Sequence, residues 1–274
     1  MAHLGLQSRL RDARVLITGA GTSAYAAIGL VAAAWPRSLA VPSTDLLLAT
    51  KSYIHDVDVL LVARSGDSPE SLAVVDRVHR LQPGVLQMAI TCNAGGALAG
   101  SPLVNSIILD PRTNDQSLVM TSSFSNLVLA GLCLANDDLE PVVQCGASAV
   151  QTRFTMIDEF AKKLAAEAED RILLLASAPL FGWAQEGALK VLEMTAGRFP
   201  VMAETYLGLR HWPMSFLRPD TLVICLLSND AWRRRYEEDL IRELRAKGLG
   251  HLVGICGDER ESQLFDEMIP ALLP

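Results

Sequence analysis

The sequence predicts an α/β fold made of two similar units, each a parallel sheet covered by helices. Short runs of β-branched and Leu residues are followed by Gly/Ser loops and then by helical periods. This rhythm is typical of parallel sheets that are buried on both faces. It occurs twice along the chain, in the same order. The length of 274 residues, half of them hydrophobic, suits one or two packed domains.

The composition excludes several classes of protein. With 50% hydrophobic and 20% charged residues, the chain is not globally disordered. The formal net charge of −7 argues against nucleic acid as the main partner, although it allows a local positive pocket. The odd cysteine count and the absence of a C-x-x-C spacing predict reduced thiols in a cytoplasmic protein, without a disulfide framework or zinc site. These cysteines are Cys92, Cys133, Cys145, Cys225 and Cys256.

The first unit is predicted to occupy residues 1–136. Its candidate strands are 15–17, 57–62, 86–91 and 106–109, and helices fit between them at 23–34, 69–81 and 122–135. The uncharged stretch 15–35 is long enough to cross a bilayer. Glycines and hydroxyl groups at 18–23 divide it into a strand, a loop and a helix, so we expect no membrane span and no membrane partner. Four charges in the first fourteen residues argue against a secretory signal.

A linking helix is predicted over 137–170 and a second unit over 171–274. Residues 171–175 repeat the pattern of 14–17, residues 220–224 that of 58–62, and residues 250–255 that of 84–89. The offsets of 157, 162 and 166 residues grow slowly while the order is kept, which indicates a duplicated unit. Because the chain stops at Pro274, we expect the second copy to be truncated and to lack counterparts of the strand and helix at 106–135.

Two loops suit the binding of a small anion. Gly19-Ala20-Gly21-Thr22-Ser23 joins a strand to a helix, where glycines allow a close backbone approach and the helix N-terminus offers free N–H groups. Arg64-Ser65-Gly66-Asp67-Ser68-Pro69 ends on an N-capping serine and a proline at the first helical position. Loops at the carboxyl ends of neighbouring parallel strands form ligand sites. Without a Walker lysine, a sugar phosphate is favoured over a nucleoside triphosphate. Tight turns and helix capping are the structural alternatives.

A third hydroxyl cluster, Thr121-Ser122-Ser123, opens a predicted helix. It either contacts sugar oxygens or caps that helix.

Glu186, Lys190 and Glu193 are spaced to share one face of a helix. A lysine between two carboxylates suits proton transfer beside a carbonyl group, and a solvated Glu–Lys pair is the alternative. His211 lies at a loop or helix end, where it either titrates near neutral pH in function or is simply a surface histidine. The run 233–239 is expected to be a solvated helix face.

Together these segments resemble the sugar isomerase (SIS) domain superfamily, most closely the tagatose-6-phosphate ketose/aldose isomerase family, also described as galactosamine-6-phosphate deaminases. The segments that carry the resemblance are 16–24, 63–71, 90–94, 120–124, 186–197 and 207–211. The resemblance implies two tandem flavodoxin-like SIS subdomains, a homodimer, and no metal or organic cofactor. Trp212 and Met214 stand where the family usually has Gly and Lys.

The resemblance also implies residue roles. The phosphate-binding set is Gly21, Thr22, Ser23, the Arg64 backbone N–H, Ser65 and Ser68, and Thr121 with Ser122 is placed at the sugar. Glu193 matches the carboxylate that moves a proton between C1 and C2, with Glu186 beside it. Lys190 matches the lysine that engages the open-chain carbonyl. His211 matches the ring-opening histidine, which in the synthase relatives comes from the neighbouring subunit.

The expected function is therefore an aldose–ketose isomerase or deaminase acting on an amino-sugar phosphate. A non-catalytic phosphosugar sensor with the same fold is the second hypothesis. A nucleotide-binding oxidoreductase is the third, and it is disfavoured because no acidic residue ends the strand after the glycine loop.

Overall fold

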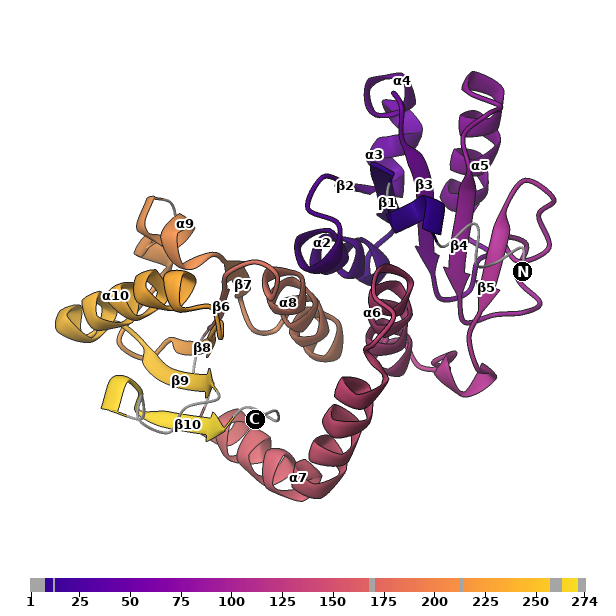
Figure 1. Cartoon of the computed structure of the whole chain (residues 1–274). Coiled ribbons are helices and arrows are strands. Elements are labelled where there is room, and N and C mark those ends of the chain that lie inside the picture. The colour runs from indigo at the N-terminus through magenta and orange to yellow at the C-terminus, as the bar shows by residue number, and fades with distance from the viewer. Residues whose placement is uncertain (1–7, 12, 168–170, 212–213, 257–262, 271–274) are drawn as a thin grey trace. The chain divides into compact units, whose positions relative to one another are not determined.

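The computed structural model of the chain describes residues 8–11, 13–167, 171–211, 214–256 and 263–270. The chain divides into two compact units, residues 1–139 and 140–274. Each unit contains a five-stranded sheet in which every neighbouring pair of strands is parallel, with helices packed against it (Figure 1). The predicted α/β class with two tandem units is confirmed.

The sheet of the first unit has the strand order of flavodoxin-like folds, β2-β1-β3-β4-β5. Its strands are β1 (Val15–Gly19), β2 (Leu39–Pro42), β3 (Asp58–Ala63), β4 (Gln87–Thr91) and β5 (Asn105–Ile108). All four predicted strands are present. The edge strand β2 was not predicted, because it is only four residues long and half-exposed and so has no long apolar run.

Helices cover both faces of this sheet. Helices α2 (Thr22–Ala34) and α6 (Ser122–Ala135) pack against each other, and the three predicted helices of the unit are all found. Helices α3 (Ser43–Leu48), α4 (Thr50–Tyr53) and α5 (Pro69–Leu81) lie together, and a 3-10 turn, η1, spans Pro111–Thr113. Apolar side chains of α5 pack with Leu16 of β1 and with alternate residues of β3 in one core. Because the strands are buried on both faces, the loops at their ends are the places left for ligands.

The second unit repeats this topology with the strand order β10-β9-β8-β6-β7. Its strands are β6 (Ile172–Ala176), β7 (Val201–Glu204), β8 (Leu222–Leu226), β9 (His251–Cys256) and β10 (Glu267–Pro270). Its helices are α7 (Glu140–Glu167), α8 (Phe181–Thr195), α9 (Tyr206–His211), the 3-10 turn η2 (Met214–Phe216) and α10 (Ala231–Lys247). Read from its other end, this order is that of the first sheet.

Two details of the predicted duplication are wrong. Strand β10 pairs with β9 as β5 pairs with β4, so the second copy does have a counterpart of the strand at 106–109. It was missed because Glu267-Met268-Ile269-Pro270 is short and carries no β-branched run. In addition, Asp58 lies beside Val15 whereas Leu222 lies beside Ile172, so Leu222 rather than Asp220 is the counterpart of Asp58.

Two hydrophobic cores flank the second sheet. On one face, Leu164 of α7 and Ala184 and Ala188 of α8 pack with Ile172 and Leu174 of β6. On the other face, residues of α9 and α10 pack with alternate residues of β6, β8 and β9. Helix α8 is therefore fixed on the sheet, which gives the polar residues along its length a defined position.

The predicted solvated face at 233–239 is wrong for Glu237, which is fully buried. Its carboxylate accepts a hydrogen bond of 2.9 Å from the backbone N–H of Ser228, and Arg234 Nε lies 3.9 Å from the same oxygen. Burial raises the pKa of Glu237. Glu237 thus supports the loop that follows β8 from inside the unit.

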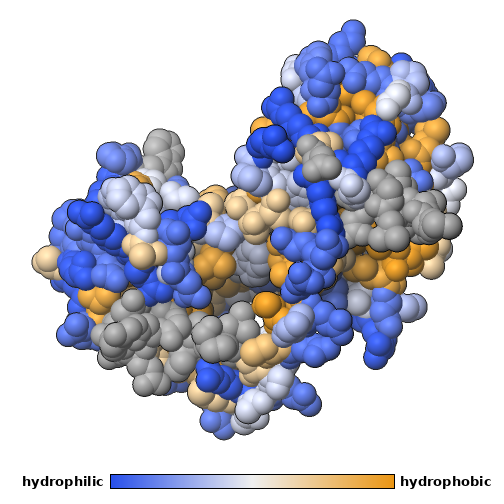
Figure 2. All heavy atoms as spheres, viewed as in Figure 1, coloured by the Kyte–Doolittle hydropathy of each residue, from blue (hydrophilic) through white to orange (hydrophobic). Residues whose placement is uncertain are grey.

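No helix within the described ranges is long and apolar enough to cross a membrane. Hydrophilic residues make up most of the surface visible in Figure 2, with apolar residues scattered among them. Cys92, Cys133, Cys145 and Cys225 form no disulfide bond within the described residues, and Cys92 and Cys225 are buried.

We predict that Gly254→Ala lowers the free energy of unfolding by about 1–3 kcal/mol, the usual cost of overpacking a core. A Cβ atom at Gly254 in β9 would lie 2.6 Å from the ring of Phe265, which is buried and cannot move aside easily. Urea denaturation should show a lower midpoint with an unchanged slope. Gly84→Ala is the matched control, since a Cβ atom there meets nothing within 4 Å. Equal midpoints for the two variants would contradict the prediction.

Candidate functional site

A pocket of about 120 Å³ lies in the first unit, where β1 and β3 end and α2 and α5 begin. It is lined by Ala20, Ser23, Val62, Ala63, Arg64, Ser65, Gly66, Ser68, Ser71 and Met120. Ser23, Arg64, Ser65 and Ser68, which the sequence placed in the phosphate-binding set, are thus brought together. Gly21, Thr22, Thr121 and Ser122 do not line this pocket.

The first loop is shaped by glycines that no other residue replaces easily. Gly21 has a positive φ of 56°, a conformation that favours glycine. A Cβ atom on Gly19 would lie 2.7 Å from the carbonyl oxygen of Val62. This close packing of β1 on β3 brings the first turn of α2, with the buried Thr22 and Ser23, to the edge of the pocket. The Ser23 hydroxyl makes no hydrogen bond with any described residue, which leaves it available to a ligand.

The second loop is held by its own serines. Ser68 caps α5 by accepting a 3.4 Å hydrogen bond from the N–H of Ser71, and the two hydroxyl oxygens are 2.7 Å apart. Ser65 Oγ accepts a hydrogen bond of 3.3 Å from the N–H of Asp67. Gly66 has a φ of 68°, which turns the chain between them.

The segment after β4 supports this second loop from behind. Asn93 Nδ2 donates to the carbonyl oxygen of Ser65 at 3.0 Å, and the N–H of Leu98 donates to that of Gly66 at 2.9 Å. At Gly96 a Cβ atom would lie only 2.2 Å from the Ser65 carbonyl oxygen, so the two backbones approach each other as closely as glycine allows. The position of the second loop, residues 64–68, therefore depends on Gly96.

The pocket is suited to an anion. Arg64 is the one charged residue among its lining residues, and the other polar groups there are hydroxyls. Helices α2 and α5, each of 13 residues, begin at the pocket, and the N-terminus of a helix carries a partial positive charge. A phosphate group would meet serine hydroxyls, N–H groups and one cation.

Ser71 lines the pocket but was not among the predicted site residues. It is buried in the first turn of α5, three residues after the capping Ser68. The signal that was available is this spacing, because a residue three positions after an N-cap faces the cap.

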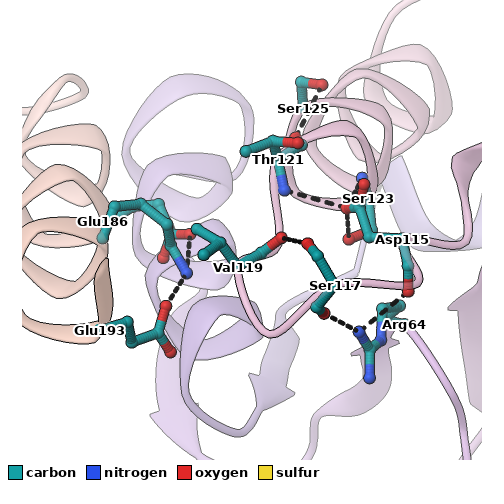
Figure 3. A network of polar contacts seen from close by, with 10 residues as sticks. Arg64, Asp115, Ser117, Val119, Thr121, Ser123, Ser125, Glu186 and Glu193 are labelled. Atoms are coloured by element: carbon teal, nitrogen blue, oxygen red, sulfur yellow. Dashed lines mark hydrogen bonds and ion pairs between the residues drawn. The ribbon is translucent and has the colours of Figure 1, made fainter. Parts of the chain in front are cut away.

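The hydroxyl cluster at the start of α6 is organised by Asp115. Asp115 Oδ2 accepts hydrogen bonds from Ser123 Oγ at 2.6 Å, from Ser123 N at 2.8 Å and from Thr121 N at 2.9 Å (Figure 3). Burial opposes ionisation of Asp115, but the hydrogen bonds donated by Ser123 and by nearby backbone N–H groups outweigh it and lower the pKa. Ser123 is fully buried and serves as a cap partner, whereas the hydroxyl of the exposed Thr121 makes no hydrogen bond within the described ranges.

In the second unit, Glu186, Lys190 and Glu193 form the cluster that their spacing predicted. Lys190 Nζ lies 3.1 Å from Glu186 Oε1 and 2.6 Å from Glu193 Oε2, and Figure 3 labels both carboxylates. The Glu186 side chain is 7% exposed and that of Glu193 is 25% exposed. Glu193 is therefore the carboxylate with more access to a substrate, while Glu186 holds the lysine from the protein side.

His211 is the last residue of α9 and is exposed. It makes no hydrogen bond or ion pair with the described residues, while Trp212 and Pro213 lie outside them. Helix α9 is fixed by its neighbours, since Arg210 forms ion pairs of 2.7 Å with Asp239 and 2.8 Å with Glu243 of α10. Tyr206 at the other end is buried and donates its hydroxyl to the carbonyl oxygen of Leu226 at 3.1 Å. The end of α9 thus presents His211 from a fixed helix.

A larger recess of about 480 Å³ lies in the first unit near the amino ends of β1 and β3, with Arg9, Arg14, Asp56 and Asp58 among its lining residues. Asp58 is committed to Arg9 through hydrogen bonds of 2.6 and 2.7 Å. The charges that line this recess are of both signs and partly paired. We therefore place the candidate site at the smaller pocket lined by Ser23, Ser65, Ser68 and Ser71, called the serine pocket from here on. No cluster of three or more His, Cys, Asp or Glu side chains suited to a metal ion occurs in the described part of the chain.

Comparison with known proteins identifies relatives over most of the chain. It is 37% identical over 262 residues to AgaS of Streptomyces coelicolor, covering 90% of this chain and 68% of the relative. It is 34% identical over 255 residues to the D-galactosamine-6-phosphate deaminase AgaS of Escherichia coli, covering 86% and 65%. No protein-family model matches.

Solved structures agree with these relatives. The tagatose-6-phosphate ketose/aldose isomerase of Escherichia coli superposes with a TM-score of 0.88 at 30% identity, covering all of this chain and 78% of that one. The C-terminal domain of glucosamine-fructose-6-phosphate aminotransferase from Francisella tularensis shares the fold, with a TM-score of 0.77 at 17% identity. The chain spans about two thirds of the length of its curated relatives. On this evidence, the resemblance seen in the sequence is confirmed and the chain belongs to the family of AgaS and the tagatose-6-phosphate ketose/aldose isomerases.

Proposed function

We propose that this protein is a deaminase of amino-sugar phosphates of the galactosamine-6-phosphate class, working through an aldose–ketose proton transfer. The observation that carries the proposal is the Lys190 ammonium held within 3.1 Å of two carboxylates on one helix face. The names of the relatives, galactosamine-6-phosphate deaminase and tagatose-6-phosphate ketose/aldose isomerase, support the same chemistry.

The serine pocket is the proposed phosphate site. Ser23, Ser65, Ser68 and Ser71 line it and supply hydroxyl donors, and Arg64 supplies positive charge. Uncharged donors with a single cation suit a phosphate ester that must enter and leave, because a fully compensated ion pair would hold it more strongly. Gly21 and Thr22 contribute by shaping the first turn of α2. The Arg64 backbone N–H lies in the second loop, beside Ser65.

The proposed reaction begins with ring opening assisted by His211, which gives the open-chain aldehyde. Glu193 then removes the proton from C2, and Lys190 stabilises the charge that develops on the C1 oxygen. Return of this proton to C1, together with transfer of one amine proton to the C1 oxygen, gives a C1 hydroxyl group and a 2-imine. Water adds to C2 of the imine and ammonia leaves, so an amino-sugar phosphate and water become a ketose phosphate and ammonia. With oxygen in place of nitrogen at C2, the same steps interconvert an aldose and a ketose.

The two carboxylates have different proposed roles because their environments differ. Glu186 is nearly buried and fixes Lys190, which keeps the ammonium in place as Glu193 gains and loses its proton. Glu193 is the more exposed of the two and carries the proton. This division agrees with the general need for a base that reaches the substrate and a cation that is already oriented.

We also propose that two copies of the chain associate in the cytoplasm. Val142, Val150 and Phe154 on α7 are exposed apolar residues and lie within about 120° of one another around the helix axis, at ~100° per residue. Exposed apolar stripes of this kind are typical of protein–protein contacts. Cys133 and Cys145 are exposed and form no disulfide bond within the described part of the chain, which suits a reducing compartment.

Replacing Glu193 with Gln should lower the rate of ammonia release from galactosamine-6-phosphate by at least ~100-fold, the usual contribution of a general base. Proton exchange at C2, followed by NMR in deuterated water, should fall in parallel. Glu159→Gln is the control, because it removes the same charge from an exposed site on α7. Exchange at C2 without ammonia in the wild-type protein would identify an isomerase instead, and full activity in Glu193→Gln would refute the assignment of the base.

Gly96→Ala should weaken the binding of inorganic phosphate by about tenfold, because displacing the Ser65 carbonyl costs ~1–3 kcal/mol and 1.4 kcal/mol is a factor of ten in affinity. Isothermal titration calorimetry measures the dissociation constant directly. Gly95→Ala is the adjacent control, since its Cβ atom would lie an ordinary 3.6 Å from Asn93 Oδ1. If both variants bind phosphate as the wild type does, the serine pocket is not the phosphate site.

Placing a charge on the apolar stripe of α7 should separate the proposed dimer. Phe154 is 65% exposed, so Phe154→Asp is expected to leave the fold of the unit intact while removing apolar contact area. Sedimentation velocity at micromolar concentration should give a dimer for the wild type and a monomer for this variant. Thr155→Asp adds the same charge one residue away and should remain dimeric. A wild-type monomer would contradict the proposal.

A further inference from the structure

A connected set of hydrogen bonds links the second loop, residues 64–68, to the start of α6 within the first unit (Figure 3). Arg64 lines the serine pocket, and its guanidinium also binds a second segment of the chain. Arg64 Nη1 donates to the backbone carbonyl of Asp115 at 3.1 Å and to that of Ser117 at 3.4 Å. The same residue therefore touches the pocket and holds the segment that precedes α6.

That segment is in turn fastened to α6 by a carboxylate. Asp115 Oδ2 accepts three hydrogen bonds, two from Ser123 and one from the N–H of Thr121. These satisfy N–H groups at the start of α6 that the helix itself leaves unpaired, since Thr121 provides no side-chain cap. Ser117 Oγ closes the turn between them by donating to the carbonyl of Val119 at 2.6 Å.

The network divides the hydroxyls of this region into two groups. The Ser123 hydroxyl donates to Asp115, and the Ser125 hydroxyl donates to the carbonyls of Thr121 and Ser122. The Thr121 hydroxyl has no partner in the described part of the chain, and Ser122 Oγ only accepts, from Asn126 at 3.4 Å. Thr121 and Ser122 thus keep donor hydrogens for a ligand, on a backbone that Asp115 fixes.

We propose that Arg64 and Asp115 are positioning residues for the 115–122 segment. The family resemblance implies that Thr121 and Ser122 lie at the sugar. This inference rests on the proposed function and deepens it by naming the two residues that hold those hydroxyls in place. Arg64 sets the distance between the serine pocket and the 115–122 segment by holding the carbonyls of residues 115 and 117. Asp115 sets the direction of the Thr121 and Ser122 hydroxyls through the first turn of α6.

The inference predicts that the dissociation constants of inorganic phosphate and galactosamine-6-phosphate change independently, whereas at a single site both would change together. Inorganic phosphate needs only the serine pocket, whereas galactosamine-6-phosphate needs the pocket and the segment. Asp115→Ala should therefore leave the dissociation constant of inorganic phosphate within twofold of wild type. It should weaken galactosamine-6-phosphate by about tenfold, the loss expected when one or two hydrogen bonds between neutral hydroxyl groups are lost, and raise KM more than it lowers kcat.

The variants at Arg64 give an independent readout because this residue has two roles. Arg64→Met removes both the charge at the pocket and the anchor, and should weaken inorganic phosphate and galactosamine-6-phosphate alike. Arg64→Lys keeps the charge but not the planar, pre-organised donor, and should weaken the sugar phosphate more than inorganic phosphate. Equal losses for both ligands in Arg64→Lys would overturn the positioning role.

Controls keep a folding defect apart from a positioning defect. Ser123→Ala removes one hydrogen bond to Asp115 and keeps the others, so it should reproduce the Asp115→Ala pattern more weakly even if Asp115→Ala does not fold. Ser125→Ala, in the same cluster, should change neither ligand. The inference is overturned if Asp115→Ala and Ser123→Ala bind both ligands as the wild type does, or weaken both equally. A wild-type protein that binds inorganic phosphate but does not discriminate galactosamine-6-phosphate from it overturns the proposed function itself, and this inference with it.

Discussion

The serine pocket depends on the close approach of two backbone segments, Gly96 and the carbonyl of Ser65. A parallel sheet brings the carboxyl ends of β3 and β4 to the same edge, so the loops that follow them must share the same space. The chain meets this constraint by leaving no side chain at residue 96 and by turning at Gly66, whose φ is positive. Asn93 then replaces the missing side-chain contact with a hydrogen bond to Ser65. The hydroxyls of Ser65 and Ser68 can face a ligand because hydrogen bonds from Asn93 and Leu98 fix the backbone behind them.

The two units have the same strand order, and the proposed function gives them different chemistry. Helix α2 follows β1, and α8 follows β6 in the equivalent place. In that proposal the first unit uses the start of the helix, since Ser23 lies in the first turn of α2. The second unit uses the body of the helix, because Glu186 and Glu193 lie along α8 and hold Lys190 between them. Binding an anion needs the N–H groups at a helix start, whereas proton transfer needs side chains at helical spacing, and the duplicated fold offers both.

Much of this arrangement was visible in the sequence, because it follows from local patterns. Apolar runs gave the central strands, and the i, i+4, i+7 spacing gave the carboxylate–lysine cluster on α8. The edge strands β2 and β10 were missed, since four residues at a half-exposed edge have no distinctive pattern. The sequence predicts a surface position for Glu237 because a charge beside arginines is normally solvated. Its burial is compensated by tertiary contacts, among them the hydrogen bond from the N–H of Ser228 and the nearby Arg234.

The hydroxyl-rich start of α6 shows what decides function where the residue types are alike. Thr121, Ser122, Ser123 and Ser125 look interchangeable in the sequence, and each can cap a helix or bind a sugar. The choice is made by Asp115, six to eight residues earlier, which takes up Ser123 and the N–H of Thr121. A helix capped by a carboxylate from outside needs no capping hydroxyl of its own, so its first residues are released for a ligand. Asp115 thus selects which hydroxyls stay available under the proposed function, although it is not itself a hydroxyl residue. It accepts hydrogen bonds from N–H groups at the start of α6 that the serine side chains would otherwise cap.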